Sequence, residues 1–171
     1  MRHALYGVIA FSVFACAGSA KELRTTPSVH AAKAPTTAII GHRGSPRDAV
    51  ENTLDSMDAA LTAGANGIET DLCLTKDGEV ILWHDWNNEA MIAQGRQLGL
   101  ENKLRARPSP PPVGDRWRKP IYELTLAEVR AHFGYAMGTT HLEAHIPTIE
   151  EFLAWTQGKH LTQVLLDMKV P

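Results

Sequence analysis

The feature that most constrains the fold is an amphipathic helical pattern enclosed by two short apolar runs. The first run, 37–40, ends at a glycine, and the second, 68–74, follows another glycine. Between them Leu54 and Met57 begin an apolar stripe at helical spacing, behind Asn52, which we expect to cap the helix. Because a strand, a helix and a strand in this order place both strands parallel in one sheet, the sequence predicts an α/β fold.

Local signals further along the chain predict a hairpin, two more helices and a third strand. An Asp-Gly turn at 77–78 leads into a returning strand at 80–83. Thr125 and Thr148 each stand three positions before a glutamate, which is the pattern of a helix-capping box. The apolar run at 164–166 is the expected third strand of the main sheet.

A long segment separates the returning strand from the second capping box. We expect residues 86–145 to form an insertion into the sheet domain. The insertion contains a proline-rich run at 108–112, which we expect to form a polyproline II loop rather than an interdomain linker.

The first 20 residues have the layout of a secretory signal peptide. A short polar start is followed by an apolar run and by small residues at 18–20, ahead of a cut before Lys21. Residues 21–37 lack periodicity and predict a flexible tether. We expect an exported protein, periplasmic or secreted. The alternative is a membrane-anchored lipoprotein, since the residues around Cys16 loosely resemble a lipobox that would carry a lipid anchor.

Net charge and hydropathy argue against nucleic acid as a partner and against a membrane-spanning helix. The chain has 17 basic and 19 acidic residues, a formal net charge of -2, which argues against a nucleic-acid binder attracted by phosphate charge. No apolar run reaches the roughly 20 residues that a membrane-spanning helix needs. We therefore expect neither nucleic acid as a partner nor a transmembrane span.

Polar side chains stand at the carboxyl end of each predicted sheet strand. The first strand runs into a histidine and an arginine, the second carries two carboxylates at alternate positions, and the third ends in an aspartate and a lysine. These residues are His42, Arg43, Glu69, Asp71, Asp167 and Lys169. Because the carboxyl ends of parallel strands meet at one edge of a sheet, we expect them to converge there.

The hairpin brings a second histidine to the same edge. If Asp77 and Gly78 are the two central residues of the turn, the register sets His84 opposite Asp71, allowing a slip of one or two residues. Three carboxylates without thiols suit a hard divalent ion such as Ca²⁺ or Mg²⁺, and arginine and lysine suit anionic oxygens. With two histidines for general acid and base, the set predicts hydrolysis of a phosphate ester.

The chain resembles the glycerophosphodiester phosphodiesterase family in six motifs, which occur in the family's order and spacing. They are His42-Arg43-Gly44, Glu51-Asn52-Thr53, Gly67-Ile68-Glu69-Thr70-Asp71, Thr75-Lys76-Asp77-Gly78, His84-Asp85 and Ile146-Pro147-Thr148-Ile149-Glu150-Glu151. The resemblance implies a TIM (β/α)8 barrel with a small insertion after the second strand. It also implies a small-molecule partner, a glycerophosphodiester, and its metal-dependent hydrolysis to glycerol 3-phosphate and an alcohol.

The resemblance assigns a role to each candidate residue. His42 and His84 would be the acid-base pair, and Arg43 and Lys169 would contact phosphate. Glu69, Asp71 and Asp167 would bind the divalent ion, although Asp167 stands where the family has a glutamate. Glu51, Asn52 and Asp85 would support these residues, and Asp85 could equally well orient the His84 imidazole or only cap its strand.

Two alternatives remain open at the level of function. A relative of lysophospholipase D or sphingomyelinase D would share the histidine pair and the metal site. An inactive fragment that binds phosphate or metal is the other, and its basis is length. The domain predicted at 38–171 has 134 residues, whereas a TIM barrel needs about 250. We expect only the first three or so βα units of the barrel, as the N-terminal part of a longer, truncated domain.

Overall fold

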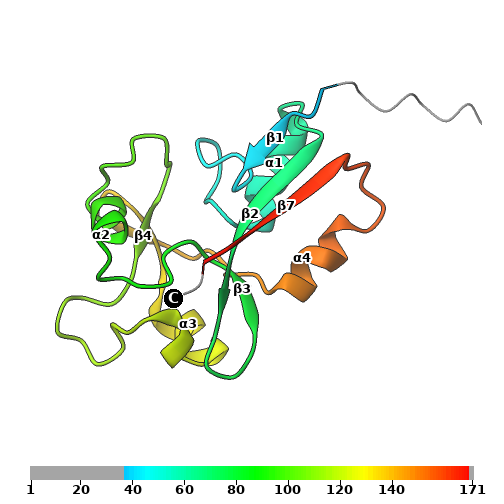
Figure 1. Ribbon diagram of the computed structural model, residues 1–171. Coiled ribbons are helices and arrows are strands. Elements are labelled where there is room, and N and C mark those ends of the chain that lie inside the picture. The colour runs from blue at the N-terminus through cyan, green and yellow to red at the C-terminus, as the bar shows by residue number, and fades with distance from the viewer. Residues whose placement is uncertain (1–36, 170–171) are drawn as a thin grey trace, which may run out of the picture. The chain divides into compact units, whose positions relative to one another are not determined.

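The computed structural model describes residues 37–169 and has the α/β organisation that the sequence predicts (Figure 1). The predicted signal peptide at 1–20, with Cys16, lies outside the described residues, and so does the predicted tether except for its last residue. Within 37–169, no helix is long and apolar enough to cross a membrane.

The main sheet is built on three parallel strands, β1 (Ile40–His42), β2 (Gly67–Leu74) and β7 (Gln163–Met168). β2 lies between the other two, and the register pairs His42 with Glu69 and Asp71 with Asp167. The predicted parallel sheet is therefore confirmed. The pairing of β1 and β7 with β2 carries the polar residues to one end of the sheet.

Two helices pack on this sheet. α1 (Leu54–Thr62) and α4 (Ile149–Thr156) contribute Met57 and Phe152 to a core that they share with β2 and β3 (Val80–Leu82). The capping box predicted at Thr148 is present at the start of α4.

The predicted cap of α1 is wrong by one residue. Thr53 is the N-cap, and its hydroxyl accepts a hydrogen bond from the Ser56 N–H at 3.2 Å. Asn52 adopts a left-handed conformation with φ 54° and buries its side chain instead. The two neighbours are both good capping residues, so the sequence alone does not separate them.

The hairpin of β2 and β3 is shifted by one residue from the predicted register. Leu72 pairs with Leu82, and the Trp83 N–H donates to the Asp71 carbonyl at 3.1 Å, so Trp83 and not His84 stands opposite Asp71. The reason is the turn, which has three residues with Gly78 in the left-handed region at φ 87°. The prediction assumed a two-residue turn.

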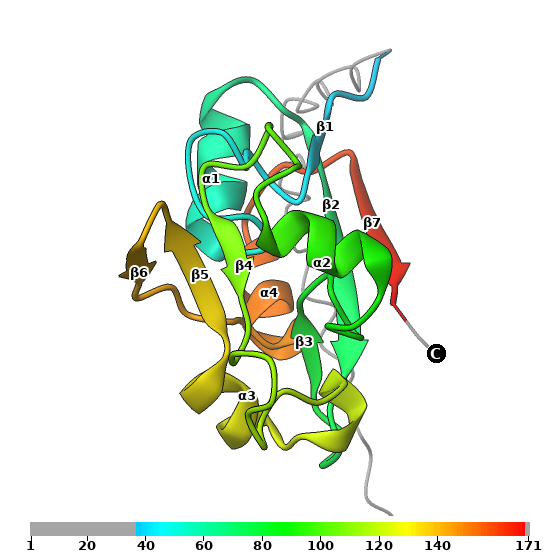
Figure 2. The ribbon, with the colours of Figure 1, turned by 90° about the vertical axis from the view of Figure 1, so that its left-hand side faces the viewer.

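The insertion carries a small sheet of its own (Figure 2). Its elements are α2 (Met91–Gln97), β4 (Arg107–Ser109), the 3-10 helix η1 (Ile121–Glu123), α3 (Leu126–His132), β5 (Gly134–Met137) and β6 (Thr140–Leu142). The predicted capping box at Thr125 opens α3. The polyproline II prediction is wrong for Pro108, which pairs with Tyr135 in β4, an edge strand that tolerates proline.

Trp83 joins the insertion to the main sheet. It follows β3 directly and is 1% exposed, with its ring 5.1 Å from that of Tyr135 and 6.1 Å from that of Phe133. The chain returns from the insertion beside the same strand, because the Leu82 N–H donates to the Pro147 carbonyl at 2.9 Å. The insertion therefore leaves and re-enters the sheet domain at adjacent points.

Candidate active site

The loop after β1 has a conformation that only a few residues can adopt. Arg43 and Gly44 both have positive φ, 56° and 82°. A Cβ on Gly44 would lie 2.4–2.6 Å from atoms of Ser56, so the close approach requires glycine. The Arg43 N–H donates to the Glu69 carbonyl at 3.0 Å and lies 2.9 Å from its carboxylate, which fixes this loop against β2.

Three carboxylates converge where β2 and β7 pair. Glu69, Asp71 and Asp167 each offer an oxygen, and these oxygens lie within 4.8 Å of one another. Burial and the charge of Asp71 raise the pKa of Glu69, which is the result expected when like charges are crowded. An all-oxygen set of carboxylates is the kind that hard divalent cations prefer, so the cluster fits such an ion.

Two cations adjoin the carboxylate cluster. Arg43 Nε lies 2.9 Å from Asp71 Oδ2, and its Nη1 donates to Glu51 at 3.0 Å. Lys169 Nζ lies 3.2 Å from Asp71 Oδ1 and also contacts Asp167. Burial opposes the effect, but the hydrogen bond to Asp167 and the charge of Asp71 raise the pKa of Lys169. Both groups therefore stay positively charged.

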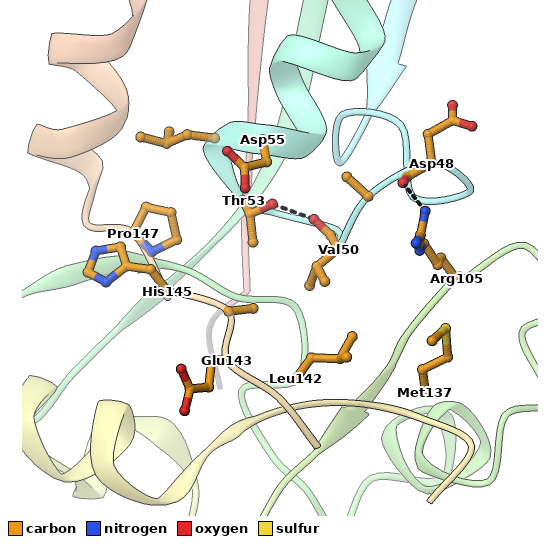
Figure 3. A pocket seen from close by; sticks show the side chains of 13 residues that line it. Asp48, Val50, Thr53, Asp55, Arg105, Met137, Leu142, Glu143, His145 and Pro147 are labelled. Atoms are coloured by element: carbon orange, nitrogen blue, oxygen red, sulfur yellow. Dashed lines mark hydrogen bonds between the residues drawn. The ribbon is translucent and has the colours of Figure 1, made fainter. Parts of the chain in front are cut away.

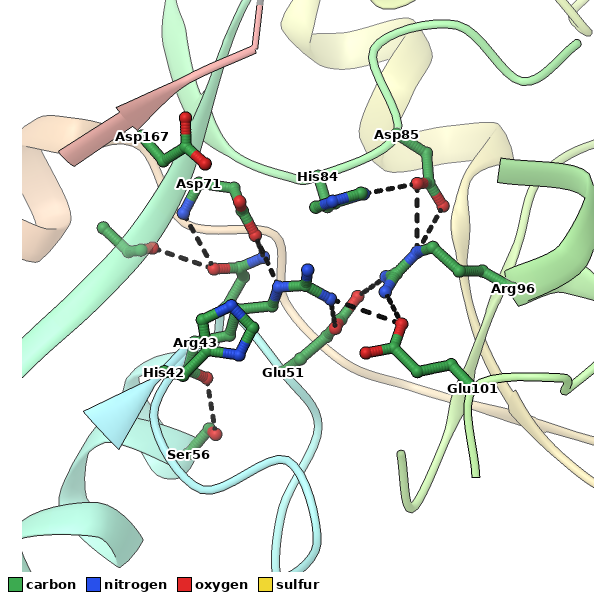
Figure 4. Close-up of polar contacts among 12 residues, drawn as sticks. His42, Arg43, Glu51, Ser56, Asp71, His84, Asp85, Arg96, Glu101 and Asp167 are labelled. Carbon is green, nitrogen blue, oxygen red and sulfur yellow. Dashed lines mark hydrogen bonds and ion pairs between the residues drawn. The ribbon is translucent and has the colours of Figure 1, made fainter. Parts of the chain in front are cut away.

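The two predicted histidines differ in their surroundings (Figure 4). His84 Nδ1 lies 2.6 Å from Asp85 Oδ1, and its side chain is 15% exposed. His42 is 64% exposed, with Nε2 3.8 Å from Glu69 Oε2. Of the two readings left open for Asp85, orientation of the His84 imidazole agrees with this contact.

Asn52 holds Asp71, one of the candidate metal ligands, through side-chain hydrogen bonds. Its Nδ2 donates to Asp71 Oδ2 at 2.9 Å, and its Oδ1 accepts from the Thr70 hydroxyl at 2.9 Å and from the Asp71 N–H at 3.2 Å. All three hydrogen bonds are buried, so Asn52 fixes both the backbone and the carboxylate of Asp71.

Sequence reasoning missed Arg96 and Glu101, both from the insertion. Arg96 contacts Glu51, Asp85 and Glu101, and the Glu101 carboxylate lies 3.5 Å from Arg43 Nη1. No motif spacing marks either residue, because they approach the site only through the fold of the insertion.

Two cavities flank this region. One of about 210 Å³ lies beside His84 and Lys169 and is also lined by Trp86 and Ile92. The other, of about 590 Å³, lies between the β1–α1 loop and the insertion (Figure 3). None of the predicted site residues lines the larger cavity, whereas His84, Asp85 and Lys169 line the smaller one.

The fold and the site together define an α/β protein with a cluster of three carboxylates beside two histidines and two basic side chains. The chain belongs to the glycerophosphoryl diester phosphodiesterase family, whose model matches residues 42–171. A glycerophosphodiester phosphodiesterase of Caldanaerobacter subterraneus subsp. tengcongensis is 45% identical over 49 residues, which are 29% of this chain and 20% of that protein.

Two solved structures have a similar fold. A glycerophosphoryl diester phosphodiesterase from Parabacteroides distasonis has a TM-score of 0.53 at 26% identity, over 78% of this chain and 39% of that one. For a glycerophosphodiester phosphodiesterase from Agrobacterium tumefaciens the TM-score is 0.55 at 24% identity, over 78% and 48%, which shows the fold alone. The chain thus spans less than half the length of these relatives.

Proposed function

We propose that this chain carries the catalytic centre of an exported, metal-dependent glycerophosphodiester phosphodiesterase. The observation that carries the proposal is the convergence of the Glu69, Asp71 and Asp167 carboxylates beside Arg43 and Lys169. The reaction would convert a glycerophosphodiester into glycerol 3-phosphate and an alcohol. The three parallel strands would be the first units of a TIM barrel, as in the family.

The divalent ion, Ca²⁺ or Mg²⁺, would be held by Glu69, Asp71 and Asp167. When bound, such an ion supplies positive charge that stabilises the negative charge developing on phosphate oxygens. Asn52 contributes by holding the Asp71 carboxylate through a 2.9 Å hydrogen bond. The shorter side chain of Asp167 still offers oxygen ligands, in the position of the family's glutamate.

Arg43 and Lys169 would bind the phosphate. Both are positively charged beside the carboxylate cluster, and guanidinium and ammonium groups suit the anionic oxygens of phosphate. Glu51 receives Arg43 Nη1 at 3.0 Å and so limits the orientations that the guanidinium can take. The phosphate would then lie between the two histidine-bearing loops.

The histidines would move the protons. Because Asp85 engages Nδ1 of His84, a neutral His84 keeps its proton there and leaves Nε2 as an acceptor, which suits a general base. We assign His84 to remove the proton of the glycerol hydroxyl that attacks phosphorus. His42 would then protonate the departing alcohol, and water would open the cyclic phosphate.

Hydrolysis of glycerophosphocholine tests this proposal. We expect activity that a chelator abolishes and that added divalent ion restores, and loss of activity in His42→Ala and His84→Ala. With p-nitrophenol as the leaving group, His42→Ala should recover most of its rate, because that alcohol needs no proton, whereas His84→Ala should not. Chelator-insensitive hydrolysis, or full activity in His42→Ala on glycerophosphocholine, would exclude the mechanism. Release of headgroups from lysophospholipid alone would favour the lysophospholipase D alternative.

A further inference from the structure

Arg96 is a buried arginine of the insertion that contacts the centre of the site. It lies on α2, and its side chain is 3% exposed. Its Nε lies 3.0 and 3.1 Å from the two carboxylate oxygens of Asp85, and its terminal nitrogens contact Glu51 and Glu101. All three guanidinium nitrogens are therefore bound by carboxylates (Figure 4).

The two most buried partners of Arg96 each hold a candidate catalytic or binding residue. The side chain of Asp85 is 2% exposed, and its Oδ1 lies 2.6 Å from Nδ1 of His84. The side chain of Glu51 is 1% exposed, and its Oε2 accepts a hydrogen bond from Nη1 of Arg43 at 3.0 Å. Arg96 is thus one residue removed from the proposed base and from the proposed phosphate ligand, and it links them through two short chains of contacts.

The geometry differs from that of an ordinary buried ion pair. Without Arg96, the buried Glu51 carboxylate would keep only its contact with Arg43, and the buried Asp85 carboxylate only its contact with His84. The planar guanidinium fork of Arg96 satisfies both carboxylates in fixed directions. Burial alone would lower the pKa of Arg96, but the charges of Glu51, Asp85 and Glu101 raise it above its usual value. Arg96 therefore stays positively charged.

Arg118 is a matched arginine in the same insertion. Its side chain is 7% exposed, and it binds Glu89, Gln97 and the Asn88 and Pro111 carbonyls, none of which belongs to a candidate site residue. Burial of an arginine in the insertion therefore does not by itself bring it to the site.

We propose that Arg96 is a positioning residue, which holds Asp85 and Glu51 so that the His84 imidazole and the Arg43 guanidinium each keep one orientation. The insertion then completes the catalytic centre. This inference rests on the proposed function for its kinetic consequence, but the orientation of His84 can be measured without it.

The test compares Arg96→Met and Arg96→Lys with Arg118→Met. Loss of an outer residue that orients a site typically lowers activity about 10–100-fold. We expect a fall of that size in kcat for glycerophosphocholine with both Arg96 variants and a change in KM below about threefold, while Arg118→Met stays near wild type. Arg96→Lys keeps the charge, so it serves if Arg96→Met fails to fold. Wild-type kcat in Arg96→Lys would overturn the proposal.

An NMR measurement separates this inference from the proposed function. In protein labelled with ¹⁵N-histidine, the Nδ1 proton of His84, assigned with His84→Gln, should exchange slowly in wild type and in Arg118→Met. It should exchange rapidly in Arg96→Lys. A protein that fails to hydrolyse glycerophosphodiesters but shows this pattern would refute only the proposed function. A slow proton in folded Arg96→Lys would refute the positioning role.

Discussion

Replacement of Asn52 by glycine should destabilise the protein strongly although it relieves the left-handed backbone. Because glycine adopts φ 54° without strain, any loss of stability in this variant comes from the missing side chain. The change removes three buried hydrogen bonds, to the Asp71 carboxylate, the Asp71 N–H and the Thr70 hydroxyl. Two of these bonds join neutral groups and the third joins a charged one.

The expected magnitude follows from these three bonds. A neutral hydrogen bond contributes about 1 kcal/mol and one to a charged group about 1.5–3 kcal/mol, so Asn52→Gly should lower the free energy of unfolding by roughly 3–5 kcal/mol. Asn52→Ala adds about 1 kcal/mol more, because alanine is strained at positive φ. For a chain of this size, about 2–4 °C of Tm is lost per kcal/mol.

Urea unfolding followed by circular dichroism measures both variants. The control is Asn102→Gly, which changes an exposed asparagine of the insertion and should stay within about 0.5 kcal/mol of wild type. A second readout is calorimetric titration with Ca²⁺ or Mg²⁺, whose affinity should fall about 10–100-fold in Asn52→Gly because Asp71 loses its support. An unfolding free energy within about 1 kcal/mol of wild type in Asn52→Gly would refute the reasoning.

Three further predictions concern single positions. Gly44→Ala should prevent folding, because its Cβ would lie within 2.6 Å of Ser56 backbone atoms, whereas Gly78→Ala, in open space at φ 87°, should cost about 1 kcal/mol in thermal unfolding. Burial alone would raise the pKa of Asp85, but the hydrogen bond with the His84 imidazole and the charge of the Arg96 guanidinium lower it. The ionised Asp85 therefore contributes stability above about pH 4, and this contribution is lost as pH falls further. Asp85→Asn should therefore flatten the dependence of unfolding free energy on pH below that point, and an unchanged slope would contradict this. Thr148→Ala should cost about 1 kcal/mol through its capping hydrogen bond, with Thr148→Ser near wild type in urea unfolding.

The parts of the fold that depend on local chemistry were predictable from sequence. The capping box at Thr148 is made by residues three positions apart, and the parallel pairing of β2 and β7 follows from strand and helix periodicity. The register of the hairpin was missed by one residue, because an Asp-Gly pair is compatible with turns of two or three residues. Only packing on both sides of the hairpin selects between them.

The composition of the site divides in the same way. Glu69 and Asp71 could be placed on one face because alternate strand residues share a face. Arg96 could not be placed, since its environment is assembled from Glu51, Asp85 and Glu101, which lie in three separate segments. Asn52 carried a motif, but its left-handed backbone and its bonds to β2 are long-range features that a local capping pattern hides.

The adjacent entry and exit of the insertion give it the character of an exchangeable module. Leu82 and Pro147 are hydrogen-bonded, and Ile81 forms a β-bridge with Thr148, so the chain between them closes on itself at one point of the sheet domain. Lengthening such a closed excursion costs little entropy, about 0.6 kcal/mol for each doubling. Evolution can therefore remodel this segment without disturbing the strands, provided that each replacement supplies an anchor for Trp83 and a cation in the place of Arg96.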